Sequence, residues 1–163
     1  MKKQHYLALM AWSRQTPRRA FFLEMLCRVL PMIAGGLYLA AAVWLLVIHA
    51  PELPRFLAVP ALTLALVSLL RRALNRPRPY EVWPEATPLL RSHHRGKGCP
   101  SRHAASGLVI ALAGLAVWPL LGVVLMILAL AIGASRVVAG VHFLGDVLWG
   151  FGLAALCGVL LFL

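Results

Sequence analysis

A histidine and an aspartate near the end of the chain have the spacing of a catalytic pair. His142 and Asp146 stand four positions apart, and residues at that spacing share one face of a helix. A carboxylate placed there can accept the imidazole Nδ1 proton, which fixes the tautomer and leaves Nε2 as a nucleophile or base. Such a pair is more often a structural hydrogen bond when it stands alone, so its meaning depends on the residues around it.

Arginines supply the second part of the chemistry. A guanidinium is planar and permanently charged, and it suits the oxygens of a phosphoryl group. Arg71, Arg78 and Arg136 lie near the ends of apolar runs without a carboxylate for each of them, a pattern that indicates an anionic ligand. Ser101 begins another run, where the N–H groups of a helix N-terminus add donors for phosphate. The basic residues of the neighbouring loop fit an ordinary solvated face: Arg91, Arg95 and Lys97.

Together these residues predict a two-step phosphoryl transfer. His142 attacks phosphorus and forms a phosphohistidine, while His103 protonates the departing oxygen. Water then attacks the phosphohistidine, with His103 acting as the base. The arginines supply the positive charge that Mg²⁺ supplies in other phosphoryl-transfer enzymes, so we expect neither a metal ion nor another cofactor.

A zinc site is the competing interpretation of some of the same residues. His93, His94, Cys99 and His103 are all potential ligands. Adjacent histidines rarely both bind one metal ion, and the spacing matches no common zinc pattern. We therefore set the zinc site aside.

The composition indicates a membrane protein. Hydrophobic residues make up 61% of the 163 residues and the mean hydropathy is +0.84, whereas soluble domains are typically about 45–50% apolar. The excess falls into runs of roughly 16–22 residues, near the ~20 that a membrane-spanning helix needs. We expect one all-α domain, residues 1–163, folded as a polytopic membrane helical bundle with about five transmembrane helices. The runs cover approximately residues 29–48, 54–70, 103–117, 120–135 and 142–163.

Two segments lie outside these runs. Residues 1–28 mix basic and apolar side chains, which predicts an N-terminal interfacial amphipathic helix or, equally, a partly ordered basic tail. Residues 73–100 are polar and rich in proline, and we expect the active-site loop there. The net charge of +11 flanks the apolar runs, so membrane lipids rather than nucleic acid are the expected partners. The sequence carries no signal for an oligomeric state.

Antiparallel packing of the spans would bring the polar groups together. The end of the second run, the start of the third, the end of the fourth and the start of the fifth all fall on one membrane face. The opposite face has little charge beyond Glu52 and Arg55. Ionisable residues at membrane spans are costly and usually functional, so this convergence predicts a site. The basic N-terminal segment falls on the same face, and the positive-inside rule then favours a cytoplasmic site in the inner membrane over an outward one.

The order and spacing of these residues resemble the type 2 phosphatidic acid phosphatase (PAP2) superfamily, whose pattern has three parts: KxxxxxxRP, PSGH and SRxxxxxHxxxD. The third part is complete at residues 135–146. The second part reads PSRH at residues 100–103, and the first reads RRALNRPRP at residues 71–79. The resemblance implies an all-helical membrane phosphatase.

The resemblance also implies a role for each matching residue. His142 matches the nucleophile of the family, Asp146 the partner of that nucleophile, and His103 the general acid. The phosphate-binding set of the family matches four positions: Arg71, Arg78, Ser101 and Arg136.

Two positions depart from the family pattern. Arg71 stands where the family usually has lysine, which keeps the charge but replaces a point charge with a planar fork. Arg102 stands where the family has glycine, a residue that lets the backbone approach a ligand closely. Our hypothesis is that Arg102 contacts a second anionic group on the substrate, and we include it among the phosphate-binding residues.

The expected function is metal-independent hydrolysis of a phosphomonoester or diphosphate on a membrane lipid, through a phosphohistidine. Candidate substrates are polyprenyl phosphate or diphosphate, phosphatidic acid and phosphatidylglycerol phosphate. One alternative is a lipid phosphotransferase, which passes the phosphoryl group to another lipid instead of water. The other is a non-catalytic membrane scaffold, against which the intact His103, His142 and Asp146 argue.

Overall fold

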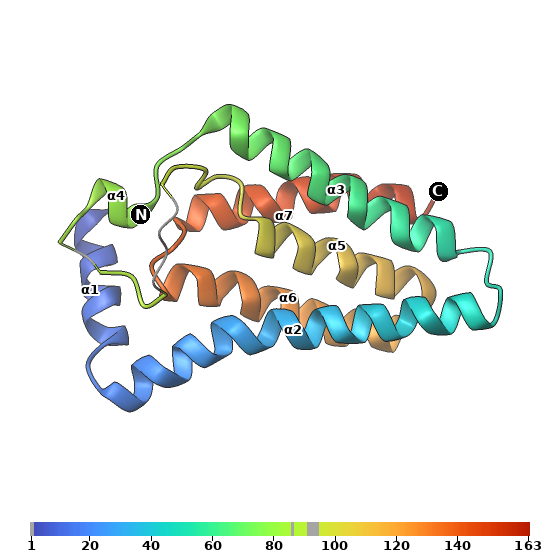
Figure 1. Cartoon of the computed structure of the whole chain (residues 1–163), viewed down its shortest axis with the longest axis horizontal. Helices are drawn as coiled ribbons and strands as arrows, with labels where there is room; N and C mark the ends of the chain where they lie inside the picture. The colour runs from blue at the N-terminus through green and yellow to red at the C-terminus, as the bar shows by residue number, and fades with distance from the viewer. Residues whose placement is uncertain (1, 86, 91–94) are drawn as a thin grey trace.

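Five long helices run along a common axis, and a shorter helix lies across one end of them (Figure 1). The computed structural model describes residues 2–85, 87–90 and 95–163. In chain order the helices are α1 (Lys3–Ser13), α2 (Pro17–Val47), α3 (Leu53–Leu74), α4 (Pro79–Val82), α5 (Arg102–Val117), α6 (Pro119–Val138) and α7 (Leu144–Gly158), followed by the 3-10 turn η1 (Val159–Leu161). The expected all-α fold is confirmed.

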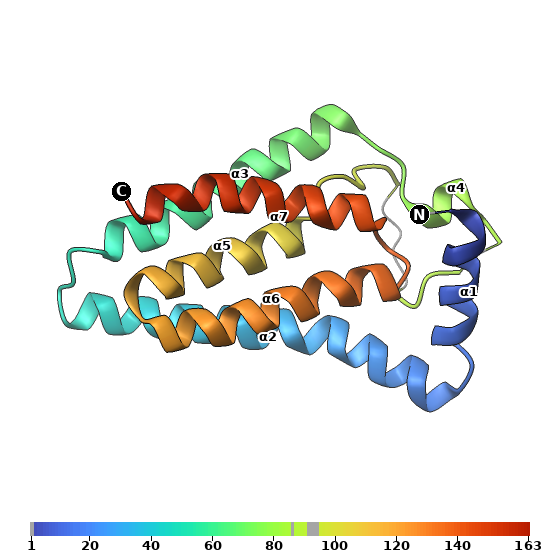
Figure 2. The ribbon, with the colours of Figure 1, turned by 180° about the vertical axis from the view of Figure 1, so that it is seen from behind.

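The centre of the bundle is α5, which contacts α2, α3, α6 and α7, as both views show (Figures 1 and 2). Its buried residues are mostly alanine and glycine, and small side chains let membrane helices approach closely. A Cβ added at Gly114 would lie 2.9 Å from a methyl carbon of Leu125 and 3.3 Å from the backbone of Gly122 in α6. The α5–α6 contact therefore depends on glycine.

The reversal between α5 and α6 is tight, as the two-residue gap between the expected runs 103–117 and 120–135 requires. Trp118 ends α5 and also precedes α6, in which Pro119 occupies the first position. Proline suits that position because its missing N–H would have no helical partner there. A Cβ at Gly122 would fall 2.3 Å from the Cα of Leu115, so the turn closes directly onto α5.

Four segments are long and apolar enough to cross a membrane by length and composition: residues 17–47, 53–82, 119–138 and 144–161. α5 has 16 residues, about 24 Å at roughly 1.5 Å per residue, and is shorter than each of these four segments. The outer helices expose many large apolar side chains, among them Leu62 and Leu120, as lipid-facing surfaces do. The chain is a multi-pass membrane protein.

The first long helix begins at Pro17 rather than near Val29. The Thr16 side chain accepts a hydrogen bond from the Arg19 N–H at 3.3 Å, and Pro17 follows as the first helical residue. These are ordinary helix-start signals. The 31 residues of α2 span about 46 Å, so its first turns extend beyond a hydrocarbon core of ~30 Å.

The N-terminal residues form a helix that packs on the protein. α1 buries Tyr6, Met10 and Ser13, which share one helical face, and the Tyr6 hydroxyl donates to the Gly140 carbonyl at 2.7 Å. A Cβ on Gly140, whose φ is +73°, would lie 2.5 Å from the Met10 sulfur. The apolar face of α1 is thus turned toward the end of the bundle, and burial raises the pKa of Tyr6 to about 12.

Candidate active site

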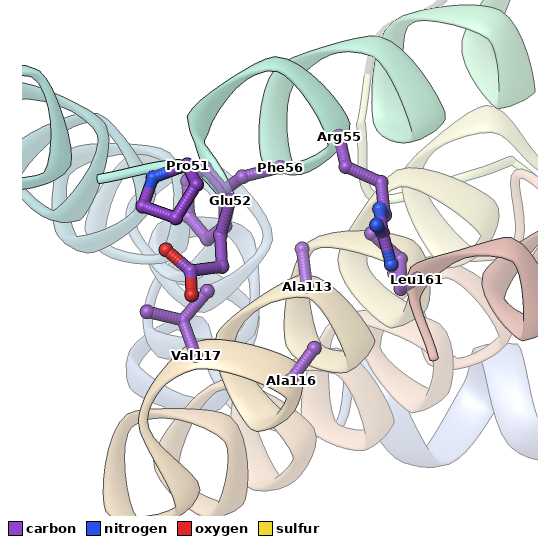
Figure 3. A pocket seen from close by; sticks show the side chains of 8 residues that line it. All are labelled: Pro51, Glu52, Arg55, Phe56, Ala113, Ala116, Val117 and Leu161. Carbon is purple, nitrogen blue, oxygen red and sulfur yellow. The ribbon is translucent and has the colours of Figure 1, made fainter. Parts of the chain in front are cut away.

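The residues predicted to form the site lie at the end of the bundle that α1 covers: Arg71, Arg78, Ser101, Arg102, His103, Arg136, His142 and Asp146. That end holds the last turn of α3, the first turn of α5, the last turn of α6 and the first turn of α7, together with the loop between α3 and α5 (Figure 1). A separate cavity of about 270 Å³ lies at the opposite end, where Glu52 and Arg55 are the charged residues of its lining (Figure 3). The expected convergence on one face is present in the structure.

The expected pair of His142 and Asp146 is held at the start of α7. Asp146 is fully buried, and its Oδ2 accepts the Phe143 N–H at 2.9 Å. His142 Nδ1 lies 3.6 Å from the same Oδ2, slightly beyond hydrogen-bond length. Among the described residues Nδ1 has no other partner, so a small rotation of either side chain completes the bond.

Burial lowers the pKa of His142, and the charges of Arg78 and Arg71 lower it further, while Asp146 acts in the opposite direction. The imidazole is therefore neutral near pH 7, which is the form that can attack phosphorus. His142 is 3% exposed, so a substrate reaches its side chain only through the site.

An arginine that the sequence analysis missed contacts the same carboxylate. Arg76 Nη1 lies 3.5 Å from Asp146 Oδ1, and its guanidinium stacks over the Phe143 ring at 5.6 Å. Ser101 adds a third link, because its backbone N–H donates to the Asp146 carbonyl at 2.8 Å. The start of α7 is thus tied both to the loop after α3 and to the start of α5.

Three of the four arginines predicted to bind phosphate are each positioned by a backbone carbonyl. Arg71 Nη1 donates to the Pro100 carbonyl at 2.7 Å, and Arg78 Nε donates to the Gly96 carbonyl at 3.3 Å. Arg136 Nη2 donates to the Cys27 carbonyl in α2. All three side chains are buried, and within the described chain none of them forms an ion pair with a carboxylate. Their remaining N–H groups are the donors that an anion would use.

The start of α5 presents the remaining predicted residues. Ser101 is buried and caps the helix, with its Oγ accepting the Ala104 N–H at 3.5 Å. Arg102 and His103 are exposed. Both line a cavity of about 380 Å³ whose other walls come from α2, α3 and α6, and Arg136, His142 and Arg71 lie within electrostatic reach of His103.

A glutamate in α4, not singled out from the sequence, organises the loop between α3 and α5. The Glu81 carboxylate accepts the Gly96 N–H at 2.8 and 3.0 Å and the Arg78 N–H at 3.3 Å. Gly96 has a φ of +62°, and a Cβ there would lie 2.4 Å from the Asn75 side chain. Glycine is therefore required at the point where the loop folds back on the end of α3.

A third cavity, of about 410 Å³, lies beside the phosphate-binding arginines. We call it the basic cavity, and its lining is Ser68, Arg71, Arg72, Arg78, Arg95, Lys97 and Arg102. Arg72 had not been singled out. Arg95 and Lys97 are exposed, as expected for a solvated face, but they line this cavity. Their clustering depends on how the loop folds, which no spacing in the sequence reveals.

In the described part of the chain, no three His, Cys, Asp or Glu side chains are close enough together to hold a metal ion. His93 and His94, which were considered as zinc ligands, lie outside the described residues, as does Arg91. Burial raises the pKa of the Cys99 thiol, which disfavours the thiolate form that binds zinc.

Comparison with known proteins confirms the family. The PAP2 superfamily matches residues 52–163, more than half of the chain. The chain therefore belongs to the PAP2 superfamily, and it is a phosphatase, a hydrolase of phosphoric esters. No curated protein matches the sequence.

Solved structures share the fold. The crystal structure of Aquifex aeolicus LpxE aligns with a TM-score of 0.74 at 22% sequence identity, covering 96% of this chain and 93% of that one. The crystal structure of the first transmembrane PAP2 type phosphatidylglycerolphosphate phosphatase from Bacillus subtilis aligns with a TM-score of 0.50 at 23% identity, covering 97% and 90%. At these identities the likeness shows the fold.

Proposed function

We propose that this protein hydrolyses a phosphate ester or anhydride on a membrane lipid, with His142 as the nucleophile. The observation that carries the proposal is the meeting of two environments at His103. On one side lie the buried arginines and the neutral His142, and on the other an apolar cavity that runs into the bundle. A phosphorylated lipid has the same two parts in the same order.

The first step transfers the phosphoryl group to the protein. His142 Nε2 attacks phosphorus while Asp146 accepts a hydrogen bond from the Nδ1–H and stabilises the positive charge that develops on the ring. The bond from phosphorus to the lipid oxygen breaks, and His103 gives that oxygen its proton. The arginines bind the equatorial oxygens and stabilise their charge in the transition state.

The second step restores the enzyme. A water molecule gives a proton to His103 and attacks the phosphohistidine, the P–N bond breaks, and inorganic phosphate leaves. In this scheme His103 carries the transferred proton, and Asp146 and the arginines stabilise the charges that develop. A phosphotransferase would differ only in that a second lipid hydroxyl replaces water.

The lipid tail lies in the apolar cavity between α2, α3 and α5. Its lining includes Pro31, Gly35 and Leu64 in addition to Arg102 and His103. α2 and α3 meet at their turn and separate toward the site (Figures 1 and 2). A tail can therefore pass from the bilayer between these helices while its headgroup stays at the bundle end.

Two neighbouring glycines of α2 allow this placement to be tested. A Cβ at Gly35 or Gly36 would meet no heavy atom within 4 Å, so both positions accept a large side chain without a backbone clash. Gly35 lines the apolar cavity, whereas Gly36 does not. Gly35→Phe should raise KM for a long-chain lipid phosphate about tenfold or more and leave a short soluble phosphate ester unaffected, while Gly36→Phe serves as the matched control. Equal effects of the two variants would refute the proposed tail site.

Phosphate release from a panel of lipid phosphates tests the function itself. The panel is polyprenyl phosphate and diphosphate, phosphatidic acid and phosphatidylglycerol phosphate, assayed with a chelator present and with His142→Ala as the control. We expect chelator-resistant release from at least one lipid and none from the variant. A fall in free phosphate on adding a hydroxyl-bearing acceptor lipid would favour the phosphotransferase, and no release from any lipid would favour the scaffold.

The active site faces the cytoplasm from the inner membrane in this proposal, because the basic N-terminal residues lie at the same end as the site. Single cysteines at Gln15 and His49 test it, since both residues are exposed and lie at opposite ends of α2. The native cysteines are replaced by serine. In intact cells an impermeant maleimide should label the cysteine at position 49 and spare the one at position 15. The reverse pattern would place the site outside.

A further inference from the structure

The basic cavity contains cations that the proposed chemistry does not use. Arg71 and Arg78 are part of the phosphate site, which leaves four further basic residues around the same space: Arg72, Arg95, Lys97 and Arg102. Arg95 and Lys97 lie between the parts of the family pattern, Arg72 occupies an unspecified position of the first part, and Arg102 stands where the pattern has glycine. The cavity, at about 410 Å³, is larger than one phosphate group requires.

No carboxylate lines this cavity. The chain has five acidic residues, all within the described segments. Glu24 pairs with Arg28 and Glu85 with Lys3, while Glu81 binds backbone N–H groups. The other two lie elsewhere: Asp146 is buried at the start of α7 and Glu52 lines the cavity at the opposite end (Figure 3).

The positive charge of the basic cavity therefore favours a ligand that carries more than one phosphate group. A phosphate monoester contributes about −1.5 to −2 at neutral pH, so six cations exceed one group by about four charges. Cations that line one space repel one another unless anions lie between them. A second phosphate group in the same space removes most of the excess.

Backbone hydrogen bonds hold residues 96–98, the segment beside two of the cations. Glu81 holds the Gly96 N–H, and the Gly98 N–H donates to the Arg76 carbonyl at 2.7 Å. Lys97, between these anchors, has a φ of +53°. Arg95 and Lys97 therefore adjoin backbone positions that hydrogen bonds hold in place.

Arg102 connects the basic cavity to the lipid. Its side chain lines both the basic cavity and the apolar cavity that holds the tail in the proposed function. An anionic group bound there would lie between the tail and the arginines that surround the reacting phosphate. This is the position of a second phosphate on a diphosphate lipid or on a headgroup phosphorylated twice.

We propose that Arg72, Arg95, Lys97 and Arg102 form a second anion subsite, which makes this phosphatase selective for lipids that carry two phosphate groups. The proposal rests on the lipid phosphatase function proposed above. It identifies the class of substrate by charge and leaves two arrangements, a diphosphate and a pair of separate phosphates, which the substrates below distinguish.

The test compares kcat/KM on three lipids with the same tail: a monophosphate, a diphosphate and a lipid with two separate phosphates. Neutral detergent micelles remove any contribution from an anionic membrane surface. The variants are Arg72→Gln, Arg95→Gln, Lys97→Gln and Arg102→Gly, and Arg18→Gln is the matched control because Arg18 is an exposed arginine at the same end. Thermal unfolding confirms that each variant is folded.

We expect Arg72→Gln, Arg95→Gln and Lys97→Gln each to lose about tenfold or more on one or both of the doubly phosphorylated lipids, and less than about threefold on the monophosphate. Arg102→Gly should lose more on the doubly phosphorylated lipids than on the monophosphate. Equal losses on all three lipids, or no loss on any, would overturn the subsite. Turnover of the monophosphate by wild type reports separately on the proposed function. A second measurement needs no turnover: the extra thermal stabilisation that inorganic diphosphate gives over inorganic phosphate. This difference should be larger for wild type than for the variants. The same difference in wild type and variants would also overturn the subsite.

Discussion

Replacing Asp146 with asparagine removes the charge beside the nucleophile while keeping the shape of the side chain. Oδ2 of Asp146 lies 2.9 Å from the Phe143 nitrogen and 3.6 Å from His142 Nδ1. An amide oxygen can still accept one of these N–H groups, but its NH₂ group then faces Arg76, which lies 3.5 Å from Oδ1. The substitution therefore makes the amide NH₂ and the Arg76 guanidinium, both hydrogen-bond donors, face each other at a fully buried position.

The expected loss follows from the charge that develops on the imidazole. At the observed 3.6 Å, opposite unit charges attract by roughly 4–5 kcal/mol at an effective dielectric of about 20. Because about 1.4 kcal/mol corresponds to a factor of ten in rate, kcat of Asp146→Asn should fall on the order of a thousandfold. The loss of charge-assisted hydrogen bonds should lower the free energy of unfolding by about 1–3 kcal/mol.

The assay is phosphate release in detergent at neutral pH, with thermal unfolding measured on the same preparation. Glu85→Gln is the matched control, because Glu85 is an exposed carboxylate that pairs with Lys3 at the same end of the bundle. The control should keep the wild-type kcat. If folded Asp146→Asn also stays within threefold of wild type, the assigned role of Asp146 is wrong.

Three further predictions concern the surroundings of this pair. Arg76→Gln should lower kcat about tenfold with little change in KM, because Arg76 orients Asp146 and does not line the phosphate site; a change confined to KM would contradict this. Glu81→Gln should weaken the closed loop and raise KM for the phosphorylated substrate several-fold, and hydrogen exchange of the loop amides should increase with it. Burial and the charge of Arg78 lower the pKa of His142, so the acidic limb of the kcat/KM profile should lie below the ordinary histidine value of about 6.5. Arg78→Gln should move that limb to higher pH, and an unchanged or opposite shift would show that another group controls it.

The convergence of the site was predictable because the membrane restricts topology. Once alternating spans are assigned, each helix end has only two faces to occupy, and the motif residues all occur at ends that fall on the same face. The spacing between Ser135 and Asp146 also fixed which residues the α6–α7 connection brings together. The short gap between two apolar runs likewise predicted the reversal at Trp118 and Pro119.

Other features depend on loop geometry that has no periodic signal. Arg76 contacts Asp146 only because the loop after α3 reaches the start of α7, and Glu81 reaches Gly96 only through the short helix α4. The surface that α1 covers was not predictable for a similar reason. A segment with basic and apolar side chains can lie on lipid or on protein, and only the burial of Tyr6 shows that α1 packs on the bundle.

The covalent intermediate on His142 is the central claim, and it can be detected directly. An aryl phosphate with a good leaving group needs no proton from the enzyme, so His103→Asn should still undergo the first step and then stall before hydrolysis. Quenching in base, where phosphohistidine survives, and peptide mass spectrometry should then locate one phosphoryl group on His142, and none in the His103→Asn/His142→Ala double variant. A phosphoryl group on another residue, or full turnover by His142→Ala, would contradict the proposed mechanism.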